Sequence, residues 1–136
     1  MPNLLQSIAG LPNFLIYFAL ALALLALFVT IYLQVTPYRE LELIRGGNVA
    51  AAISLSGALI GFILPLASAI AHSVNPVDMV VWALIALILQ LIVYALTARL
   101  VPHFREAIES GHNAPAVLLA ALAIAVGILN AACLTY

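Results

Sequence analysis

The side chains that could do chemistry in this 136-residue chain are few and scattered. Acid–base, nucleophilic and metal-dependent catalysis each need several such groups at one site. The three histidines are dispersed, Asp78 stands alone, and Cys133 has no second cysteine with which to form a disulfide or a metal cluster. The glutamates have arginine neighbours, so we expect them in surface ion pairs: Glu40, Glu42, Glu106 and Glu109. The sequence therefore predicts no enzymatic activity, no cofactor and no metal.

Three polar side chains fall inside long apolar stretches, where each needs a partner because hydrocarbon offers none. Gln90 lies near the middle of its stretch, Tyr94 lies one turn further on, and Asn130 lies near the end of the last stretch. We predict an interhelical hydrogen bond for Gln90, with a pore-lining role for these residues as the alternative. No charged side chain or histidine lies in the middle of any stretch. This absence argues against a proton relay, a voltage sensor or a charge-coupled carrier.

Composition places these residues in a membrane. The chain is 67% hydrophobic and 7% charged, and its mean hydropathy of +1.26 excludes a soluble globular domain. Four apolar stretches of about 20 residues match a hydrocarbon core of about 30 Å; they cover 14–33, 50–71, 79–100 and 114–134. We predict an all-α, polytopic membrane protein with four transmembrane helices in a single domain, 1–136. The first helix is expected to be retained, because no lysine or arginine precedes it to form a signal peptide.

The second half of the chain repeats the first about 65 positions later. The segment 35–52 contains a proline, an Arg-Glu pair and a Gly-Asn corner, and 100–116 contains the same features, with the Arg-Glu pair one residue later. The unit is a helix pair used twice, with repeat 1 at about 11–71 and repeat 2 at about 76–136. Two helices return the chain to its starting side, so the copies are parallel rather than inverted. A protein built from a parallel duplication is well shaped to associate with further copies of itself, so we expect a homo-oligomer.

The arginines predict the orientation in the membrane. All four lie in or beside the first and third connections: Arg39, Arg45, Arg99 and Arg105. By the positive-inside rule, the connections 36–48 and 101–113 are cytoplasmic. Four spans then place both termini outside, in the periplasm of a diderm bacterium.

Both connections are predicted to form short amphipathic helices that lie along the headgroups of the bilayer. The first begins at Thr36 and Pro37, and its apolar face holds Tyr38, Leu41 and Ile44. The second has an apolar face of Phe104, Ala107 and Ile108. The candidate docking residues on the polar faces are Arg39, Glu42, Arg45, Arg105 and Glu109. Their balanced charge gives no basic patch for nucleic acid.

Each connection ends in a glycine-asparagine corner. Gly46 with Gly47, and Gly111, can supply the left-handed conformation that ends a helix. Asn48 and Asn113 follow in positions that can cap the next span. The alternative is a ligand or ion site made by the exposed helix amides.

Small residues recur at a spacing near four in the second and fourth spans. Close backbone approach and dispersion drive helix association in lipid, and small residues permit both. The pattern predicts contact faces, either within one chain or between chains, at Ser54, Gly57, Gly61, Pro65, Ala121 and Ala125.

These residues resemble a known family. The resemblance rests on Thr36-Pro37, the run 43–52, Leu55-Ser56-Gly57, Gly61, Pro65 and the closing segment 130–135. Together they resemble the YjfL-type family of small bacterial inner-membrane proteins, grouped as domain of unknown function 350. The resemblance covers nearly the whole chain and implies a duplicated two-span module in the cytoplasmic membrane. Members are often encoded near phage-shock-type envelope-stress proteins and ATP-grasp ligases, which implies a membrane partner for peripheral factors. The resemblance implies no catalytic residues.

The leading expectation is a non-enzymatic, homo-oligomeric inner-membrane protein. It would organise the lipid bilayer or dock peripheral cytoplasmic envelope-stress proteins through its two amphipathic connections. The chief alternative is a small oligomeric channel for ions or small solutes. A carrier made of antiparallel chains conflicts with the strong arginine bias.

Overall fold

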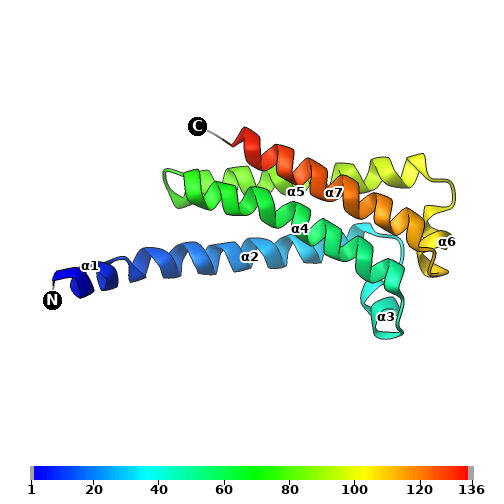
Figure 1. The fold of residues 1–136 in the computed structure, drawn as a ribbon, viewed down its shortest axis with the longest axis horizontal. Coiled ribbons are helices and arrows are strands. Elements are labelled where there is room, and N and C mark those ends of the chain that lie inside the picture. Colours follow the sequence, from blue (N-terminus) through cyan, green and yellow to red (C-terminus); the bar gives the residue numbers. More distant parts are fainter. Residues whose placement is uncertain (1, 135–136) are drawn as a thin grey trace.

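A computed structural model of the chain describes residues 2–134, so the last two residues of the second predicted repeat lie outside the described part. This part is all-helical, as predicted (Figure 1). Its helices are α1 (Pro2–Ala9), α2 (Leu11–Val35), α3 (Glu40–Arg45), α4 (Val49–His72), α5 (Pro76–Leu100), α6 (Phe104–Glu109) and α7 (Asn113–Cys133). The four long helices run alongside one another, and the short α3 and α6 lie together at one end (Figure 1).

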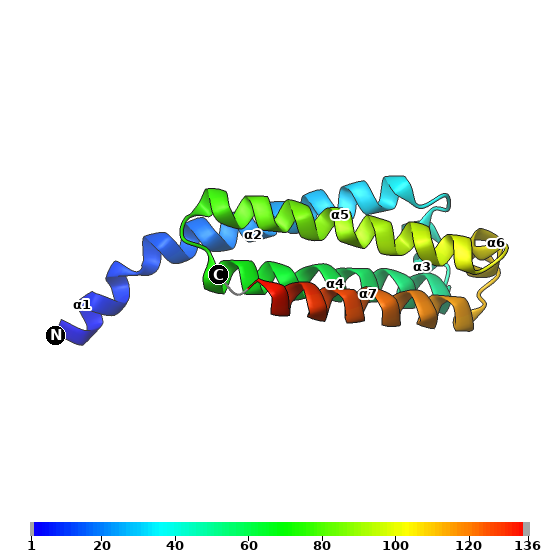
Figure 2. The same ribbon diagram turned by 90° about the horizontal axis from the view of Figure 1, so that it is seen from above.

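The described residues contain four helices long and apolar enough to cross a membrane, as predicted. They are Asn3–Val35, Val49–His72, Pro76–Leu100 and Asn113–Cys133. The shortest has 21 residues and spans about 31 Å, which matches a hydrocarbon core of about 30 Å. The first starts earlier than its apolar stretch predicts, and α1 with the start of α2 projects beyond the other helices (Figure 2).

The contact between α4 and α7 is the closest in the molecule's core. Both helices begin at the end that holds α3 and α6, so they run parallel (Figure 2). Gly57 faces the backbone of Ala120, while Gly61 lies between Ala123 and Gly127. A Cβ atom on Gly57, Gly61 or Gly127 would collide with the backbone of the facing helix. Small residues therefore allow the backbone approach on which helix packing in lipid depends.

Of the two kinds of contact predicted for Ala121 and Ala125, within one chain or between chains, the structure does not show the one within the chain among the residues that it describes. Ala121 and Ala125 are exposed within the chain, whereas Ala123 and Gly127 are buried. Two residues correspond to a rotation of about 200° around a helix, so Ala121 and Ala125 point away from α4. The predicted small residues of α4 are all buried: Ser54, Gly57, Gly61 and Pro65.

Only one half of α2 joins this core. Its buried side chains are Leu24, Phe28 and Tyr32. The Phe28 ring stacks on Phe62 of α4, with the ring centroids 4.5 Å apart. Before Leu24 the α2 side chains are exposed or half-buried. The aromatic contacts thus hold α2 to the bundle near α3 and leave its first half outside the core.

Candidate functional site at the charged end

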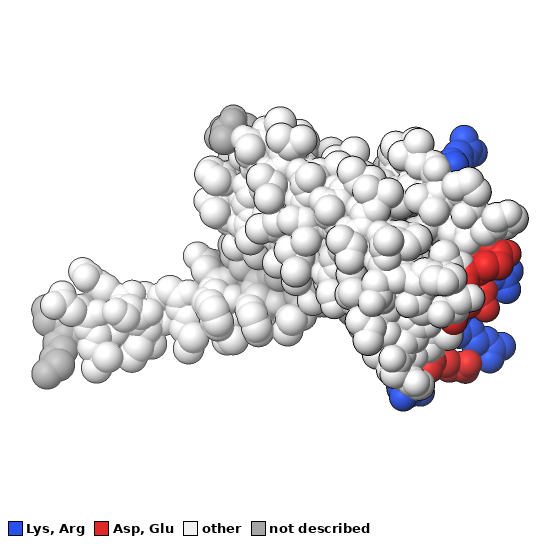
Figure 3. Space-filling view, turned by 45° about the vertical axis from the view of Figure 1, so that its right-hand side comes forward, with Lys and Arg blue, Asp and Glu red and all other residues white. Residues whose placement is uncertain are grey.

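Charge gathers at the end of the bundle that holds α3 and α6, which we call the charged end (Figure 3). It contains Arg45 in α3, Arg105 in α6, Arg39 just before α3 and Arg99 in the last turn of α5. All four glutamates lie in α3 and α6. The opposite end is formed by the turn between α4 and α5 and by the end of α7 (Figure 1). The two ends of the molecule thus differ sharply in polarity.

The short helices α3 and α6 end in the same type of turn. The amide of Gly47 donates to Ile44 and that of Asn48 donates to Leu43, at N···O distances of 2.9 and 2.8 Å. After α6, the corresponding bonds are Gly111 to Ile108 at 3.0 Å and His112 to Ala107 at 2.9 Å. This is the Schellman pattern, which requires a left-handed residue. Gly47 with φ +91° and Gly111 with φ +80° supply it, whereas Gly46 has φ −80° and does not.

The predicted caps have different outcomes in the two corners. Asn48 caps α4, because its Oδ1 accepts from the amide of Ala51 at 3.0 Å. Its Nδ2 also donates to the Ile108 carbonyl of α6 at 2.8 Å, so one side chain joins the two corners. Asn113, predicted as a cap, is instead the first residue of α7, and His112 holds the cap position without a side-chain bond. The reason is the spacing: Gly47 and Gly111 are 64 positions apart, one fewer than the two asparagines.

The first connection is also arranged differently from its prediction. The backbone amide of Thr36 donates a hydrogen bond to the Tyr32 carbonyl at 3.1 Å, and α2 ends there. Helix α3 begins only at Glu40. Within the chain, Leu41 of this helix is exposed and Glu40 is buried. Of the apolar face expected for the first connection, Tyr38 is buried and Ile44 is half-buried, whereas Leu41 is exposed within the chain.

The second connection has the predicted distribution of burial. Phe104 and Ile108 are buried, whereas Arg105, Glu106 and Glu109 are exposed.

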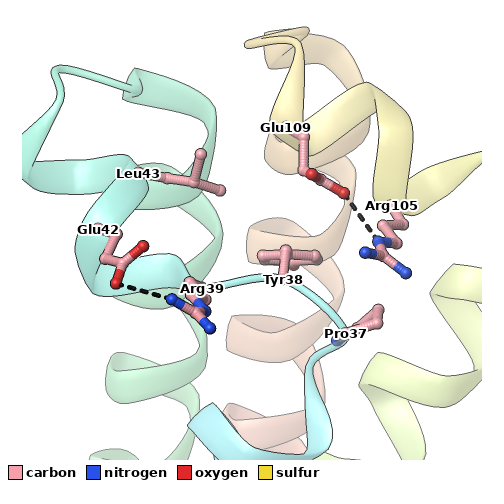
Figure 4. Close-up of a pocket in the computed structure, with 7 residues that line it drawn as sticks. All are labelled: Pro37, Tyr38, Arg39, Glu42, Leu43, Arg105 and Glu109. Atoms are coloured by element: carbon pink, nitrogen blue, oxygen red, sulfur yellow. Dashed lines mark hydrogen bonds and ion pairs between the residues drawn. The ribbon is translucent and has the colours of Figure 1, made fainter.

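Two ion pairs flank an open pocket of about 490 Å³ at the charged end (Figure 4). Arg39 pairs with Glu42 at 3.2 Å, and Arg105 pairs with Glu109 at 2.8 Å. Tyr38 lies between the two pairs (Figure 4). Exposed pairs of this kind contribute about 0–1 kcal/mol to stability. They define a polar surface rather than hold the fold together.

Beneath this surface lies a buried cluster of Tyr32, Tyr38, Glu40 and Tyr94, which we call the tyrosine–glutamate cluster. The rings of Tyr32 and Tyr94 meet edge to face with centroids 5.8 Å apart. Tyr94 meets Phe104 of α6 in the same way at 5.9 Å. The cluster therefore joins α2, α3, α5 and α6. Glu40 is only 1% exposed, so its expected role in a surface ion pair is wrong; Arg39 pairs with Glu42 instead.

Burial controls the protonation of this cluster. It raises the pKa of Glu40 to about 8, and the nearby Tyr38 hydroxyl opposes this shift only in part. It also raises the pKa of Tyr38, to which Tyr94 and Glu40 add. The Tyr38 hydroxyl interacts with the Glu40 carboxyl and with Tyr94. Among the residues that the structure describes, however, neither the carboxyl oxygens of Glu40 nor the hydroxyls of Tyr32 and Tyr38 make a hydrogen bond of standard geometry. The unligated carboxyl is therefore mostly protonated at neutral pH.

The sequence did contain a signal for the burial of Glu40. With the 64-residue spacing of the two corners, Glu40 corresponds to the buried Phe104, the first residue of α6. The 65-residue spacing of the proline and asparagine pairs hides this match, because it places Glu40 opposite an exposed arginine, Arg105. The offset used to align the two copies therefore decides whether Glu40 is expected to be buried or exposed.

The three polar residues predicted within the spans do not come together. Gln90 is buried, and its Nε2 donates to the Ala123 carbonyl of α7 at 3.1 Å, which is an interhelical bond of the expected kind. Tyr94 belongs to the tyrosine–glutamate cluster. Asn130 is half-buried in the last turns of α7, toward the opposite end. The three side chains lie at different depths of the bundle.

Four apolar helices of membrane length, with charge at one end, define an integral membrane protein of the polytopic helical class. The chain belongs to the family described as Domain of Unknown Function (DUF350), whose model matches residues 6–134. This finding confirms the resemblance seen in the sequence.

Two relatives illustrate the family's range. The chain is 38% identical over 120 residues to the UPF0719 inner membrane protein YjfL of Escherichia coli K12, covering 88% of this chain and 91% of that protein. It is 29% identical over 116 residues to the UPF0719 transmembrane protein YshE of Bacillus subtilis 168, covering 82% and 84%. No solved structure matches the chain. The names of both relatives agree with an integral membrane protein.

Proposed function

We propose that this protein is a non-enzymatic, homo-oligomeric component of the bacterial inner membrane whose charged end docks a peripheral envelope-stress protein. The observation that carries this proposal is the concentration of charge in α3 and α6 at one end of an otherwise apolar bundle (Figure 3). The Asn48 bond to Ile108 keeps the two helices in a fixed relation. A rigid polar surface suits docking, because little ordering is needed on binding.

The orientation is part of the proposal. The positive-inside rule places the charged end in the cytoplasm and both termini in the periplasm. A peripheral cytoplasmic protein would then meet the pocket between the two ion pairs (Figure 4).

A parallel duplication is also part of the proposal. Support comes from the recurrence, 64 positions apart, of a six-residue helix, a Schellman turn and a long helix: α3 with α4, and α6 with α7. The parallel packing of α4 on α7 relates the copies by an approximate twofold axis along the bundle. Such a unit can associate with further copies through its outer helices.

The docking proposal is tested by changing Arg39, Arg45 and Arg105 together to Gln. A photo-crosslinking residue at the exposed Leu41 of α3 reports which soluble proteins lie against the charged end in living cells. The triple variant should lose these cross-links while its membrane level stays normal, since all three arginines are exposed. Arg99→Gln is the matched control, because this arginine is exposed in α5 outside the two short helices. Unchanged cross-links in the triple variant would overturn the proposal.

The alternative function is an oligomeric channel. It needs a path between chains, because Gly57, Gly61 and Gly127 bring α4 and α7 into backbone contact and the chain itself buries Gln90. Ion or solute flux through sealed liposomes that contain the inserted protein would favour the channel over docking.

A further inference from the structure

We propose that the tyrosine–glutamate cluster binds a small monovalent cation, sodium or potassium, between the Glu40 carboxylate and the hydroxyls of Tyr32 and Tyr38. This site goes beyond the docking surface, because it lies beneath that surface and takes a ligand of a different kind.

Several buried polar atoms of the cluster have no hydrogen-bond partner of standard geometry in the described chain. They are the two carboxyl oxygens of Glu40 and the hydroxyl oxygens of Tyr32 and Tyr38. Buried polar groups are nearly always hydrogen-bonded, and each exception costs about 1–3 kcal/mol. Four such atoms in one cluster point to a ligand that the cluster is built to hold.

These atoms have the chemistry of ligands for a small cation. Carboxylate and hydroxyl oxygens are hard ligands that suit alkali and alkaline-earth cations rather than soft metals. One carboxylate matches the charge of a monovalent ion, whereas calcium takes about 6–8 oxygen ligands, often from several carboxylates. The aromatic rings of Tyr94 and Phe104 line the same region, and ring faces attract cations.

The arginines near the cluster pair with glutamates or remain in solvent, so none of them pairs with Glu40. Arg39 is largely exposed and pairs with Glu42. Arg105 pairs with Glu109 and also interacts electrostatically with Tyr94. Arg45 is exposed at the end of α3. The other ionisable groups around Glu40 are the tyrosines of α2, α5 and the first connection. The only ionisable side chain of α4, His72, lies at the opposite end.

Two open pockets adjoin the cluster. Glu40 lines a pocket of about 300 Å³, and Tyr38 lines the pocket of about 490 Å³ between the ion pairs (Figure 4). Both pockets open at the charged end and share Arg39 and Glu42. The carboxyl oxygens of Glu40 are themselves buried, so a cation would enter from these pockets past the side chains that cover the cluster.

Cation and proton compete for this carboxylate. Because burial raises the pKa of Glu40 to about 8, a bound cation must displace a proton at neutral pH. The apparent affinity should consequently rise with pH, by roughly 100-fold between about pH 6 and about pH 9 for a single competing proton.

The test uses the full-length protein in lipid nanodiscs, with sodium, potassium or N-methylglucamine chloride at equal ionic strength. Infrared difference spectra report the protonated carboxyl, and thermal unfolding reports binding to the folded state. We expect sodium or potassium, but not N-methylglucamine, to abolish the carboxyl band and to raise the unfolding temperature, with the larger rise at the higher pH. A carboxyl band that titrates identically in all three salts would overturn the proposal and leave a site for protons alone.

Two variants assign the effect to the cluster. Glu40→Gln should abolish the cation dependence, whereas Glu42→Gln, on the exposed face of the same helix, should retain it. If Glu40→Gln does not fold, Tyr38→Phe removes only one hydroxyl and should weaken the cation affinity. A full cation response in Glu40→Gln or in Tyr38→Phe would overturn the assignment.

Discussion

Glu40 makes the stability of the charged end depend on pH. The folded protein holds the Glu40 proton up to about pH 8, whereas the unfolded chain releases it near the ordinary value of 4.5. The folded state thus binds more protons between these values, and the stability from this group falls as the pH rises. It is fully present below about pH 4.5 and lost by about pH 8.

This linkage predicts the behaviour of Glu40→Gln. In N-methylglucamine buffer, without sodium or potassium, the wild-type protein should lose stability as the pH rises from about 5 to about 8. Glu40→Gln should remove most of this decline, because its amide carries no proton to lose. Thermal unfolding measured across the pH range checks this, with Glu42→Gln as the matched exposed control. An equally steep decline in Glu40→Gln would show that another group is responsible.

Single residues differ in how far the sequence predicts their surroundings. The interhelical bond of Gln90 follows from one rule, since an amide in hydrocarbon needs a partner wherever it lies. The burial of Glu40 depends instead on where α3 begins, and a shift of a few residues exchanges its exposed and buried faces. Arg39 beside Glu40 suggests a surface pair, but Glu42, three positions from Arg39, faces it on the helix.

The contact between α4 and α7 makes a prediction at the scale of the helix. Gly61→Val places side-chain atoms where the Ala123 backbone and the Gln90 side chain lie. We expect destabilisation by about 1–3 kcal/mol or more, as in other overpacked cores. Denaturation in mixed detergent measures this loss. Ala125→Val is the control, because Ala125 is exposed on α7; an equal loss there would contradict the described contact face.

The two Schellman turns make a second prediction at this scale. Alanine at Gly47 or Gly111 must adopt a positive φ, which costs about 1–2 kcal/mol. Gly46→Ala should have a much smaller effect, since Gly46 already has φ −80°. The same unfolding measurement compares all three variants. Equal losses at Gly46 and Gly47 would argue against the assigned turn.

The helices themselves could largely be predicted from the sequence, whereas their boundaries could not. Length and apolarity determine the four spans, because a membrane requires about 20 apolar residues per helix. Thr36-Pro37 fits the start of a helix and also the residues that follow one. The bond from Thr36 to Tyr32 shows that α2 continues to this point, which delays the start of α3. The same one-residue ambiguity places His112 rather than Asn113 at the cap of α7.

Across the whole molecule, the arginines and glutamates are concentrated at one end. Arginines and glutamates gather at the charged end (Figure 3), and the lone cysteine lies exposed near the end of α7, at the opposite end. The docking proposal requires the charged end to face the cytoplasm. The reactivity of Cys133 can therefore report on which side of the membrane this end of the protein lies.

Labelling of Cys133 tests on which side of the membrane the charged end lies. A membrane-impermeant maleimide is added to intact spheroplasts and, separately, to permeabilised cells. If the charged end faces the cytoplasm, Cys133 reacts in intact spheroplasts, whereas a cysteine placed by Arg45→Cys in a Cys133→Ala background reacts only after permeabilisation. The opposite pattern would place the charged end outside the cell and would contradict a cytoplasmic docking surface.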